Sequence, residues 1–297
     1  MFVKANAKIN VYLDVVGKRK DGYHDLDMVM LPLELHDTIE VEYLPYLTET
    51  YVVCDRVDHT ETSYDSIRKT LNLLREKYGF AHNFNITIHK EIPICAGLGG
   101  GSSNAAAVLK AFEKIIKIKM EPEDELKFCL ALGADVPFCM NNAPAHVQGI
   151  GEKLEPINLK DQYSVLIIKP KTGLSTPKVF GESDKYKLKH GNSKDVIKAL
   201  EEGNDELLAQ SMFNSLEEVS SAMCPEIQEV RKILENDGFK CVVMTGSGSC
   251  VFALTKDHIK AYNKYLKYDR KGFDVILTKT LKQKRKWFLL NAMAKIS

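Results

Sequence analysis

A glycine run, Gly97-Leu98-Gly99-Gly100-Gly101, sets the strictest local limit on how this chain folds. Four glycines in five residues cannot lie inside a strand or a helix without a cost in free energy, so the run predicts a loop. Phe84–His89 before it alternates apolar and polar residues as a strand does, and an alanine-rich helix is expected after it, to about Ile118. Ser102 and Ser103 are expected to cap that helix.

A strand, a glycine loop and a helix N-terminus together can bind an anion. Glycines let the backbone approach a ligand with several N–H groups pointing inward, and the helix dipole adds attraction. The loop is not a P-loop, because no Gly-Lys-[Ser/Thr] ends it, and its neighbours do not repeat the βαβ units of a dinucleotide-binding fold. Two interpretations stay open for the loop alone, a phosphate site and a tight structural turn.

Lys8 and Asp135 are the candidate catalytic residues. Phosphoryl transfer needs a cation on the moving phosphate and a base or orienting group at the acceptor hydroxyl. Lys8 shares a strand face with Asn10 and Tyr12, so the three could line a cleft, although alternation equally allows a lysine that points to solvent. Asp135 stands before a Val-Pro pair, where the residues alone favour a helix N-cap over a catalytic base.

Composition excludes several classes of protein. The chain has 297 residues, enough for two domains or one large one, and 41 Lys and Arg against 40 Asp and Glu leave no overall basic field for nucleic acid. The seven cysteines form no C-x-x-C pair and their number is odd, so we expect neither a disulfide framework nor a zinc site. No apolar run approaches the ~20 residues of a membrane helix, and the N-terminus lacks a signal peptide. We therefore expect a cytoplasmic protein with no membrane or nucleic-acid partner.

The remaining patterns organise the chain into two parts. Strands are predicted over Ala7–Val15, Met28–Leu35 and Thr38–Tyr43, helices over Asp65–Lys77 and Pro122–Leu132, and two apolar strands around a glycine turn within Cys241–Leu254. The polar stretch before Tyr163 predicts a boundary between an N-terminal domain over residues 1–160 and a C-terminal domain over residues 161–281. Residues 282–297, basic and then apolar, are expected to be a poorly ordered tail.

Several segments resemble the GHMP kinase superfamily. The glycine loop resembles its phosphate-binding motif, and Thr245–Ser249 resembles its C-terminal glycine motif. Further blocks are similar to the superfamily members that act on 4-diphosphocytidyl-2-C-methyl-D-erythritol: Ala7–Val15, Lys20–Leu26, Leu132–Phe138 and Gly149–Glu152. Gly22-Tyr23-His24 is the block specific to those members, and together the blocks span most of residues 5–255.

The resemblance implies a fold and a reaction. The fold would be an α+β two-domain GHMP kinase fold: an N-terminal ribosomal-S5-like α/β domain, a C-terminal α/β domain, and the active site in the cleft between them. The reaction would move the γ-phosphoryl group of ATP to the 2-hydroxyl of the cytidyl substrate, in the non-mevalonate route to isoprenoid precursors. ATP and Mg²⁺ would be required, the ion being held mostly by phosphates, water and a loop serine. The protein would be a monomer or a homodimer.

The resemblance also implies roles for matching residues. Asp135 would take the hydroxyl proton, and Lys8 would stabilise that carboxylate and the charge on the phosphoryl group. Tyr23 and His24 would stack on and hydrogen-bond the cytosine, although a half-buried tyrosine and an exposed turn histidine are the ordinary alternatives. The other substrate-binding residues would be Asn10, Thr176, Phe180, Gly246, Ser247 and Gly248. ATP would be held by Lys90, Pro93, Ile94, Cys95, Ala96, Gly97, Leu98, Gly99, Gly100, Gly101, Ser102 and Ser103, with Cys95 standing where the family usually has glycine.

Two other functions are weighed against this one. Another GHMP member, such as a homoserine or mevalonate-type kinase, should keep the glycine loop but lack the Gly-Tyr-His block. A non-catalytic nucleotide sensor should have lost Lys8 or Asp135, and both are present.

Overall fold

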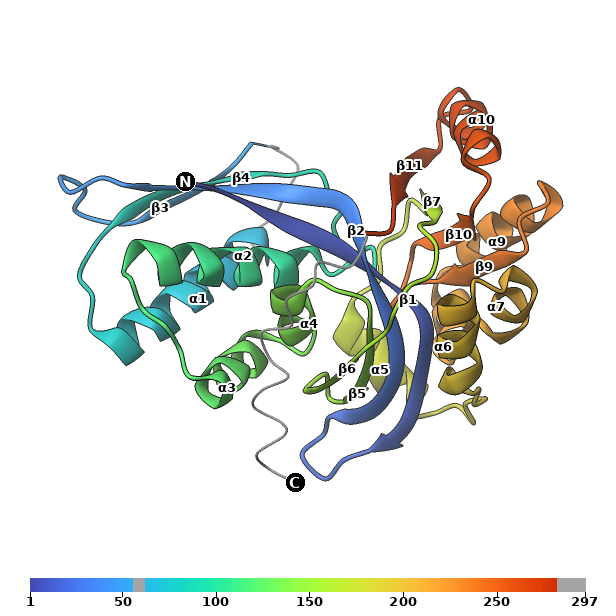
Figure 1. Cartoon of the computed structure of the whole chain (residues 1–297), viewed down its shortest axis with the longest axis horizontal. Helices are drawn as coiled ribbons and strands as arrows, with labels where there is room; N and C mark the ends of the chain where they lie inside the picture. Colours follow the sequence, from blue (N-terminus) through green and yellow to red (C-terminus); the bar gives the residue numbers. More distant parts are fainter. Residues whose placement is uncertain (56–61, 282–297) are drawn as a thin grey trace.

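The computed structural model describes residues 1–55 and 62–281, so the expected tail over residues 282–297 lies outside the described residues. Within them the strands form a seven-stranded sheet and a four-stranded sheet (Figure 1). No helix in these two ranges is long and apolar enough to span a membrane.

The first sheet is built on a long antiparallel pair, β1 (Phe2–Lys18) and β2 (His24–Tyr43). The main strand order is β3-β4-β2-β1-β8, and β5 and β6 extend the sheet from β2. The other strands are β3 (Tyr51–Cys54), β4 (Phe84–His89), β5 (Ala145–Gly149), β6 (Lys153–Pro156) and β8 (Phe213–Asn214). Where two strands were predicted, β2 is continuous, because His36 and Asp37 stay paired with β1.

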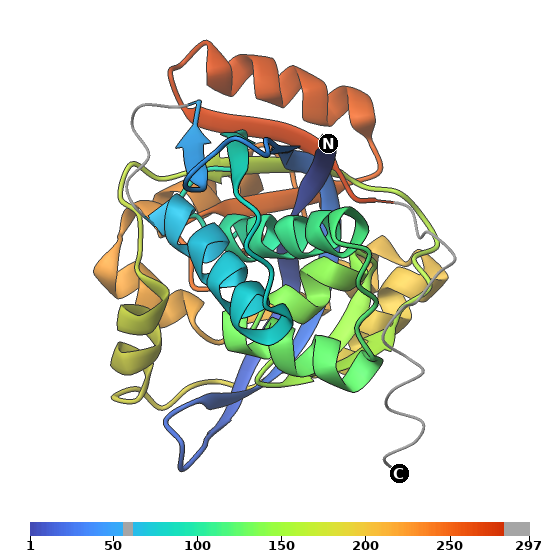
Figure 2. The ribbon, with the colours of Figure 1, turned by 90° about the vertical axis from the view of Figure 1, so that its left-hand side faces the viewer.

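Four helices lie on one side of this sheet (Figure 1): α1 (Thr62–Tyr78), α2 (Gly100–Ile115), α3 (Pro122–Leu132) and α4 (Val136–Asn141). Figure 2 shows α1 and α2 in front of its strands. Phe112 of α2 packs on Phe84 of β4 with ring centroids 4.5 Å apart. The predictions for β4 and α3 are confirmed residue for residue, whereas α2 is shorter than predicted.

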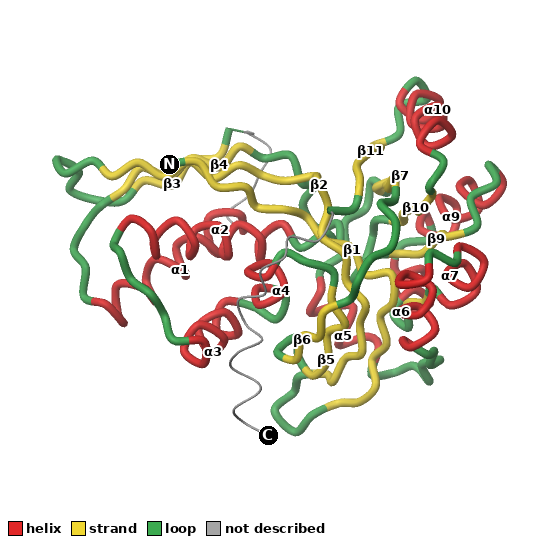
Figure 3. The backbone as a smooth tube through the Cα atoms, in the orientation of Figure 1, coloured by secondary structure: helices red, strands yellow, loops and turns green. Residues whose placement is uncertain are grey.

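The second sheet has the order β11-β7-β10-β9, and all its pairs are antiparallel. Its strands are β7 (Ser164–Lys169), β9 (Cys241–Met244), β10 (Val251–Thr255) and β11 (Asp274–Lys279). The helices of this half are α5 (Thr176–Ser183), α6 (Ser193–Glu202), α7 (Asp205–Ser211), α8 (Glu217–Met223), α9 (Glu226–Asn236) and α10 (His258–Asp269). Figure 3 shows α6, α7, α9 and α10 on the opposite side of the β1–β2 pair from α1 to α4.

The two halves are joined through β1. The short strand β8, from the C-terminal half, pairs in parallel with β1 at Tyr12 and Leu13. Ile9 and Val11 belong to the same buried cluster as Ile167 and Phe252 of the second sheet. Alternation predicted a half-buried strand, but every residue from Ala7 to Val15 is buried, because protein covers both faces of β1. The polar side chains of Lys8, Asn10 and Asp14 are therefore enclosed rather than exposed.

Candidate active site

One cavity of about 780 Å³ brings the predicted site residues together. Its walls come from β1, the β1–β2 turn, the glycine loop, the segment before α4, the start of α5 and the turn after β9. The predicted residues that line it are Lys8, Asn10, Tyr23, His24, Lys90, Pro93, Ile94, Cys95, Ala96, Gly97, Leu98, Gly99, Gly100, Gly101, Ser102, Asp135, Thr176, Phe180, Gly246 and Ser247.

The glycine loop leaves its amides free. None of the backbone N–H groups from Gly97 to Ser102 donates a hydrogen bond to any residue in the described ranges. The loop is held by its carbonyls instead, since Leu98 O accepts from Lys8 N at 3.0 Å and Gly97 O accepts from the Thr245 hydroxyl at 3.2 Å. These amides lie at the N-terminus of α2, an arrangement of unpaired donors that suits an anion.

Two glycines of the loop are required by close contacts. Gly97 has φ +74°, and a Cβ there would lie 2.1 Å from the carbonyl oxygen of Thr245. Gly99 has φ +70°, and a Cβ there would lie 2.9 Å from Cγ of Lys8. The loop therefore packs directly on the stem of Lys8, and a larger residue would push the two apart.

Lys8 and Asp135 meet at the cavity wall. Lys8 Nζ lies 3.3 Å from the Asp135 carboxylate and donates to Asn10 Oδ1 at 2.7 Å. Lys8 is only 4% exposed, which rules out the solvent-facing alternative. Asp135 occupies the N-cap position of α4 but makes no capping hydrogen bond, so the N-cap interpretation of its side chain is wrong.

A buried aspartate that the sequence analysis missed holds Lys90. Asp37 is fully buried and accepts from Lys90 Nζ at 2.6 Å. Its other oxygen accepts from the backbone N–H groups of Glu91 and Ile92 at 2.9 and 2.8 Å. A charged residue between two predicted strands carries no signal of such a role, because the partners lie in a distant segment. Asp37 fixes both the ammonium group of Lys90 and the backbone leading into the glycine loop.

Another part of the cavity wall is aromatic. The rings of His24 and Phe180 lie 5.2 Å apart at an angle of 34°, and Tyr23 is exposed at the rim. His24 Nε2 lies 2.8 Å from the carboxylate of Asp184, which Lys18 also contacts. The hydrogen bonds from Lys18 and then His24 lower the pKa of Asp184. The side chain of His24 is 10% exposed, so it is not the exposed turn histidine of the alternative interpretation.

Lys18 and Asp184 line this part of the cavity and were not predicted. Lys18 stands in a charged run that indicated only a turn, and Asp184 follows α5 in a polar segment without a motif.

Two predicted site residues, Ser103 and Gly248, do not line the cavity. Ser103 is buried, and its hydroxyl donates to the carbonyl of Asn6 instead of capping α2. The N-cap of α2 is Gly99, and no side chain caps this helix end. Gly248 N donates to Thr245 O at 3.0 Å, which closes the turn away from the cavity.

Sequence comparisons place the chain in a family. Residues 65–143 match the family model described as "GHMP kinases N terminal domain", and residues 196–274 match "GHMP kinases C terminal". A protein of Clostridium kluyveri named 4-diphosphocytidyl-2-C-methyl-D-erythritol kinase is 36% identical over 287 residues, covering 95% of this chain and all of that protein.

Solved structures agree. The crystal structure of a 4-(cytidine 5'-diphospho)-2C-methyl-D-erythritol kinase superposes with a TM-score of 0.76 at 28% identity, covering 95% of this chain and 100% of that chain. A homoserine kinase of Cytophaga hutchinsonii superposes with a TM-score of 0.72 at 16% identity, covering 95% of this chain and 94% of that chain, which shows a shared fold alone. The predicted α+β GHMP kinase fold is thereby confirmed. The chain belongs to the GHMP kinases and, within them, to the family of 4-diphosphocytidyl-2-C-methyl-D-erythritol kinases.

Proposed function

We propose that this chain transfers the γ-phosphoryl group of ATP to the 2-hydroxyl of 4-diphosphocytidyl-2-C-methyl-D-erythritol. The observation that carries the proposal is that unpaired loop amides and the Lys8–Asp135 pair line one cavity whose wall also includes His24 and Phe180. A phosphate site, a site for proton transfer and an aromatic platform are the three parts that this reaction needs.

The triphosphate belongs at the glycine loop. The amides of Gly97 to Ser102 and the N-terminus of α2 favour negative charge there, and the ammonium group of Lys90 lines the same wall. No cluster of three or more His, Cys, Asp or Glu side chains in residues 1–55 and 62–281 could hold a metal ion. An Mg²⁺ ion would enter on ATP, held mostly by phosphates and water and by the hydroxyl of Ser102, which lines that wall. The ion would neutralise phosphate charge.

The chemical step belongs to Asp135 and Lys8. The substrate oxygen bonds to the γ-phosphorus, the bond from that phosphorus to the β-phosphate oxygen breaks, and the hydroxyl proton passes to the Asp135 carboxylate. Lys8, fixed by Asn10, keeps a positive charge beside both the carboxylate and the phosphoryl oxygens. Orientation of the hydroxyl supplies much of the acceleration, as in other phosphoryl transfers.

The cytidyl group belongs at the aromatic part of the cavity wall. A flat ring with donor and acceptor atoms on its edge suits the faces of Tyr23 and Phe180 and a fixed imidazole. The Asp184 carboxylate holds the His24 ring from its Nε2 side, so its Nδ1 side is the one left for a ligand.

A coupled assay for ADP release tests the proposal. The purified chain is given Mg-ATP with the cytidyl substrate, homoserine, mevalonate or galactose in separate reactions. We expect ADP only with the cytidyl substrate. ADP release with another acceptor and none with this one would replace the assignment with a different GHMP activity, and ATP binding without turnover on any acceptor would favour a sensor.

A further inference from the structure

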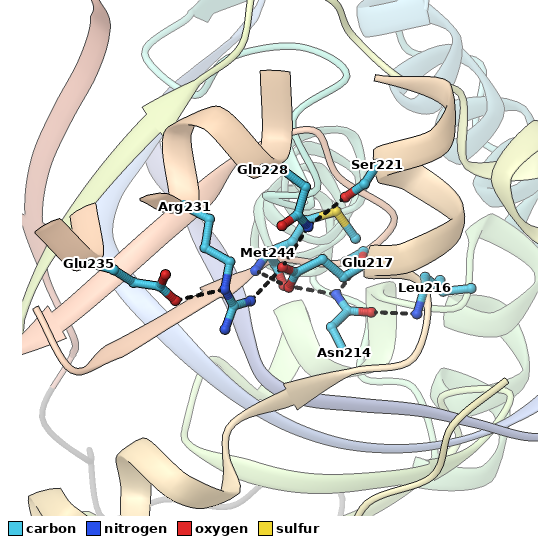
Figure 4. Close-up of polar contacts among 9 residues, drawn as sticks. Asn214, Leu216, Glu217, Ser221, Gln228, Arg231, Glu235 and Met244 are labelled. Carbon is cyan, nitrogen blue, oxygen red and sulfur yellow. Dashed lines mark hydrogen bonds and ion pairs between the residues drawn. The ribbon is translucent and has the colours of Figure 1, made fainter. Parts of the chain in front are cut away.

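A buried network of side chains binds backbone groups at the end of β9 and in the turn that follows it, and Figure 4 shows its contacts around Asn214 and Glu217. Asn214 Nδ2 donates to the carbonyls of Met244 and Gly246, both at 2.8 Å. Glu217 Oε2 accepts from Met244 N at 3.1 Å, and Ser220 Oγ donates to Ser247 O at 3.1 Å. Backbone groups of Met244, at the end of β9, and of Gly246 and Ser247 in the turn are therefore bound to side chains from one short segment.

The network is itself anchored. Arg231 forms an ion pair with Glu217 and a second one, at 2.9 Å, with Glu235 (Figure 4). Asn214 Oδ1 accepts from Leu216 N at 3.0 Å. Glu217 is a nearly buried carboxylate whose two oxygens are both bonded, which is the condition under which a buried charge is tolerated.

The hydroxyl of Thr245, the first residue of the same turn, contacts two residues that line the active site. Thr245 is fully buried, and its Oγ1 accepts from Asn10 N at 3.1 Å and donates to Gly97 O at 3.2 Å. Asn10 belongs to the strand that carries Lys8, and Gly97 begins the run of free amides. One oxygen atom therefore joins the catalytic strand to the anion-binding loop.

The loop depends on such a contact for a physical reason. A loop that presents its N–H groups to a ligand cannot use them to fix its own conformation, so its position must come from its carbonyls and its packing. The turn also packs tightly, since a Cβ on Gly246 would lie 3.0 Å from Gly97 O and 3.4 Å from Lys8 Nζ.

We propose that Thr245 is a positioning residue for phosphoryl transfer: its hydroxyl sets the distance between the loop amides and the Lys8–Asp135 pair, and Asn214, Glu217 and Ser220 hold Thr245 in place. Thr245 does not line the cavity, so it acts through Gly97 and Asn10 rather than by touching a substrate. The inference rests on the proposed function for its kinetic test.

Two substitutions separate the hydroxyl from the rest of the side chain. Thr245→Val keeps the shape and removes the hydroxyl, whereas Thr245→Ser keeps the hydroxyl and removes a methyl group. We expect Thr245→Val to lower kcat by ~10- to 100-fold and to raise the KM for ATP, because a displacement near 1 Å is that costly. The KM for the cytidyl substrate should stay within about twofold of wild type, because the substitution does not touch the aromatic part of the cavity wall. Thr245→Ser keeps the hydroxyl, so its kcat and its KM for ATP should stay within about threefold of wild type.

Thr280→Val is the matched control. Thr280 is also fully buried and its hydroxyl accepts a backbone N–H, from Tyr163, at 3.0 Å, but it does not line the cavity or bond to a residue that does. Melting temperatures show whether the variants fold, and calorimetry with a non-hydrolysable ATP analogue gives nucleotide affinity without turnover. Thr245→Val should bind the analogue more weakly than both Thr245→Ser and Thr280→Val.

The outcomes are separable. If wild type turns over and Thr245→Val matches Thr280→Val in kcat and in analogue affinity, Thr245 is only structural and the inference fails. If wild type phosphorylates no cytidyl substrate, the proposed function fails, and the analogue affinities still decide the inference. If Thr245→Val does not fold, Ser220→Ala and Ser220→Thr replace it. Ser220→Ala should lower kcat and the affinity for the ATP analogue, whereas Ser220→Thr, which keeps the hydroxyl, should restore both.

Discussion

Lys8 Nζ lies 3.3 Å from the carboxylate of Asp135, at a wall where the glycine loop and β1 are also in contact. The two residues come from a strand and from the segment before α4, far apart in the chain. Cys139 lies in the same region, where burial and then the Asp135 carboxylate raise the pKa of its thiol to about 12. The thiol therefore stays neutral.

Asp135→Asn keeps the shape of the side chain and removes its basicity. We expect kcat to fall by ~10²- to 10⁴-fold with an unchanged melting temperature, because the amide cannot take the hydroxyl proton and no longer balances Lys8. Steady-state kinetics and thermal unfolding check this. Asp124→Asn, which breaks an outlying ion pair with Lys77, is the control and should turn over normally. Near-normal turnover of Asp135→Asn would remove this residue from the chemistry.

Gly99→Ala should disable the loop through Lys8. An alanine there is strained at φ +70°, and its Cβ would lie 2.9 Å from Cγ of Lys8, so the lysine or the loop must shift. We expect kcat/KM for ATP to fall by at least ~10-fold. Gly79→Ala, at φ +65° with nothing within 4 Å, carries the backbone strain alone. It should lose stability but not activity, and equal activities for the two variants would contradict the packing argument.

Asp184→Ala should weaken binding at the aromatic part of the cavity wall. It removes the carboxylate that holds His24 Nε2 at 2.8 Å and frees Lys18. We expect the KM for the cytidyl substrate to rise ~10-fold, because the imidazole is no longer fixed. The KM for ATP should change little. Initial rates with each substrate varied in turn measure both constants, and equal rises in the two would mean that Asp184 supports the whole cavity.

His146 should make stability depend on pH. Its hydrogen bond with Asp27, at 2.6 Å, is the main cause that raises the pKa of His146. A raised pKa in the folded state stabilises the protein fully below the unfolded pKa of about 6.5, and the contribution is lost as pH rises through the folded value. We therefore expect His146→Gln to lower the free energy of unfolding more at about pH 6 than at about pH 9.

Urea unfolding of wild type and His146→Gln at both pH values measures this difference. Burial acts to raise the pKa of Asp27, but hydrogen bonds from His146 and Ser193 lower it overall. The stability that the Asp27 carboxylate contributes is therefore lost only when the pH falls below the usual range of an aspartate pKa. If the difference in unfolding free energy between wild type and His146→Gln were larger at about pH 9 than at about pH 6, the assignment of the charged pair would be contradicted.

Cys95 should make the enzyme sensitive to thiol reagents. It is exposed and lines the cavity, whereas Cys129, Cys139, Cys224, Cys241 and Cys250 are buried. We expect alkylation to abolish activity, ATP to slow the inactivation, and Cys95→Gly to resist it while remaining active, because glycine is at ease at the φ of +53° found there. Mass spectrometry locates the modified residue. Inactivation of Cys95→Gly at the wild-type rate would place the sensitive thiol elsewhere.

Local patterns in the sequence determined individual loops, strands and helices of this protein. The glycine loop, β4 and α3 were predictable because turns, alternation and helix ends depend on neighbouring residues. The motif blocks also indicated most of the residues that line the cavity.

Tertiary structure decided how those parts meet. Alternation of apolar and polar residues could not show that protein covers both faces of β1. Because both faces are covered, Lys8 is buried and pairs with Asp135 instead of pointing to solvent. No local sequence pattern indicates the roles of Asp37 and Asp184, because each contacts a side chain from a distant segment, Lys90 and His24 respectively. Burial leaves a charged side chain stable only where an opposite charge or a hydrogen bond reaches it, and only the packed chain brings those partners within range.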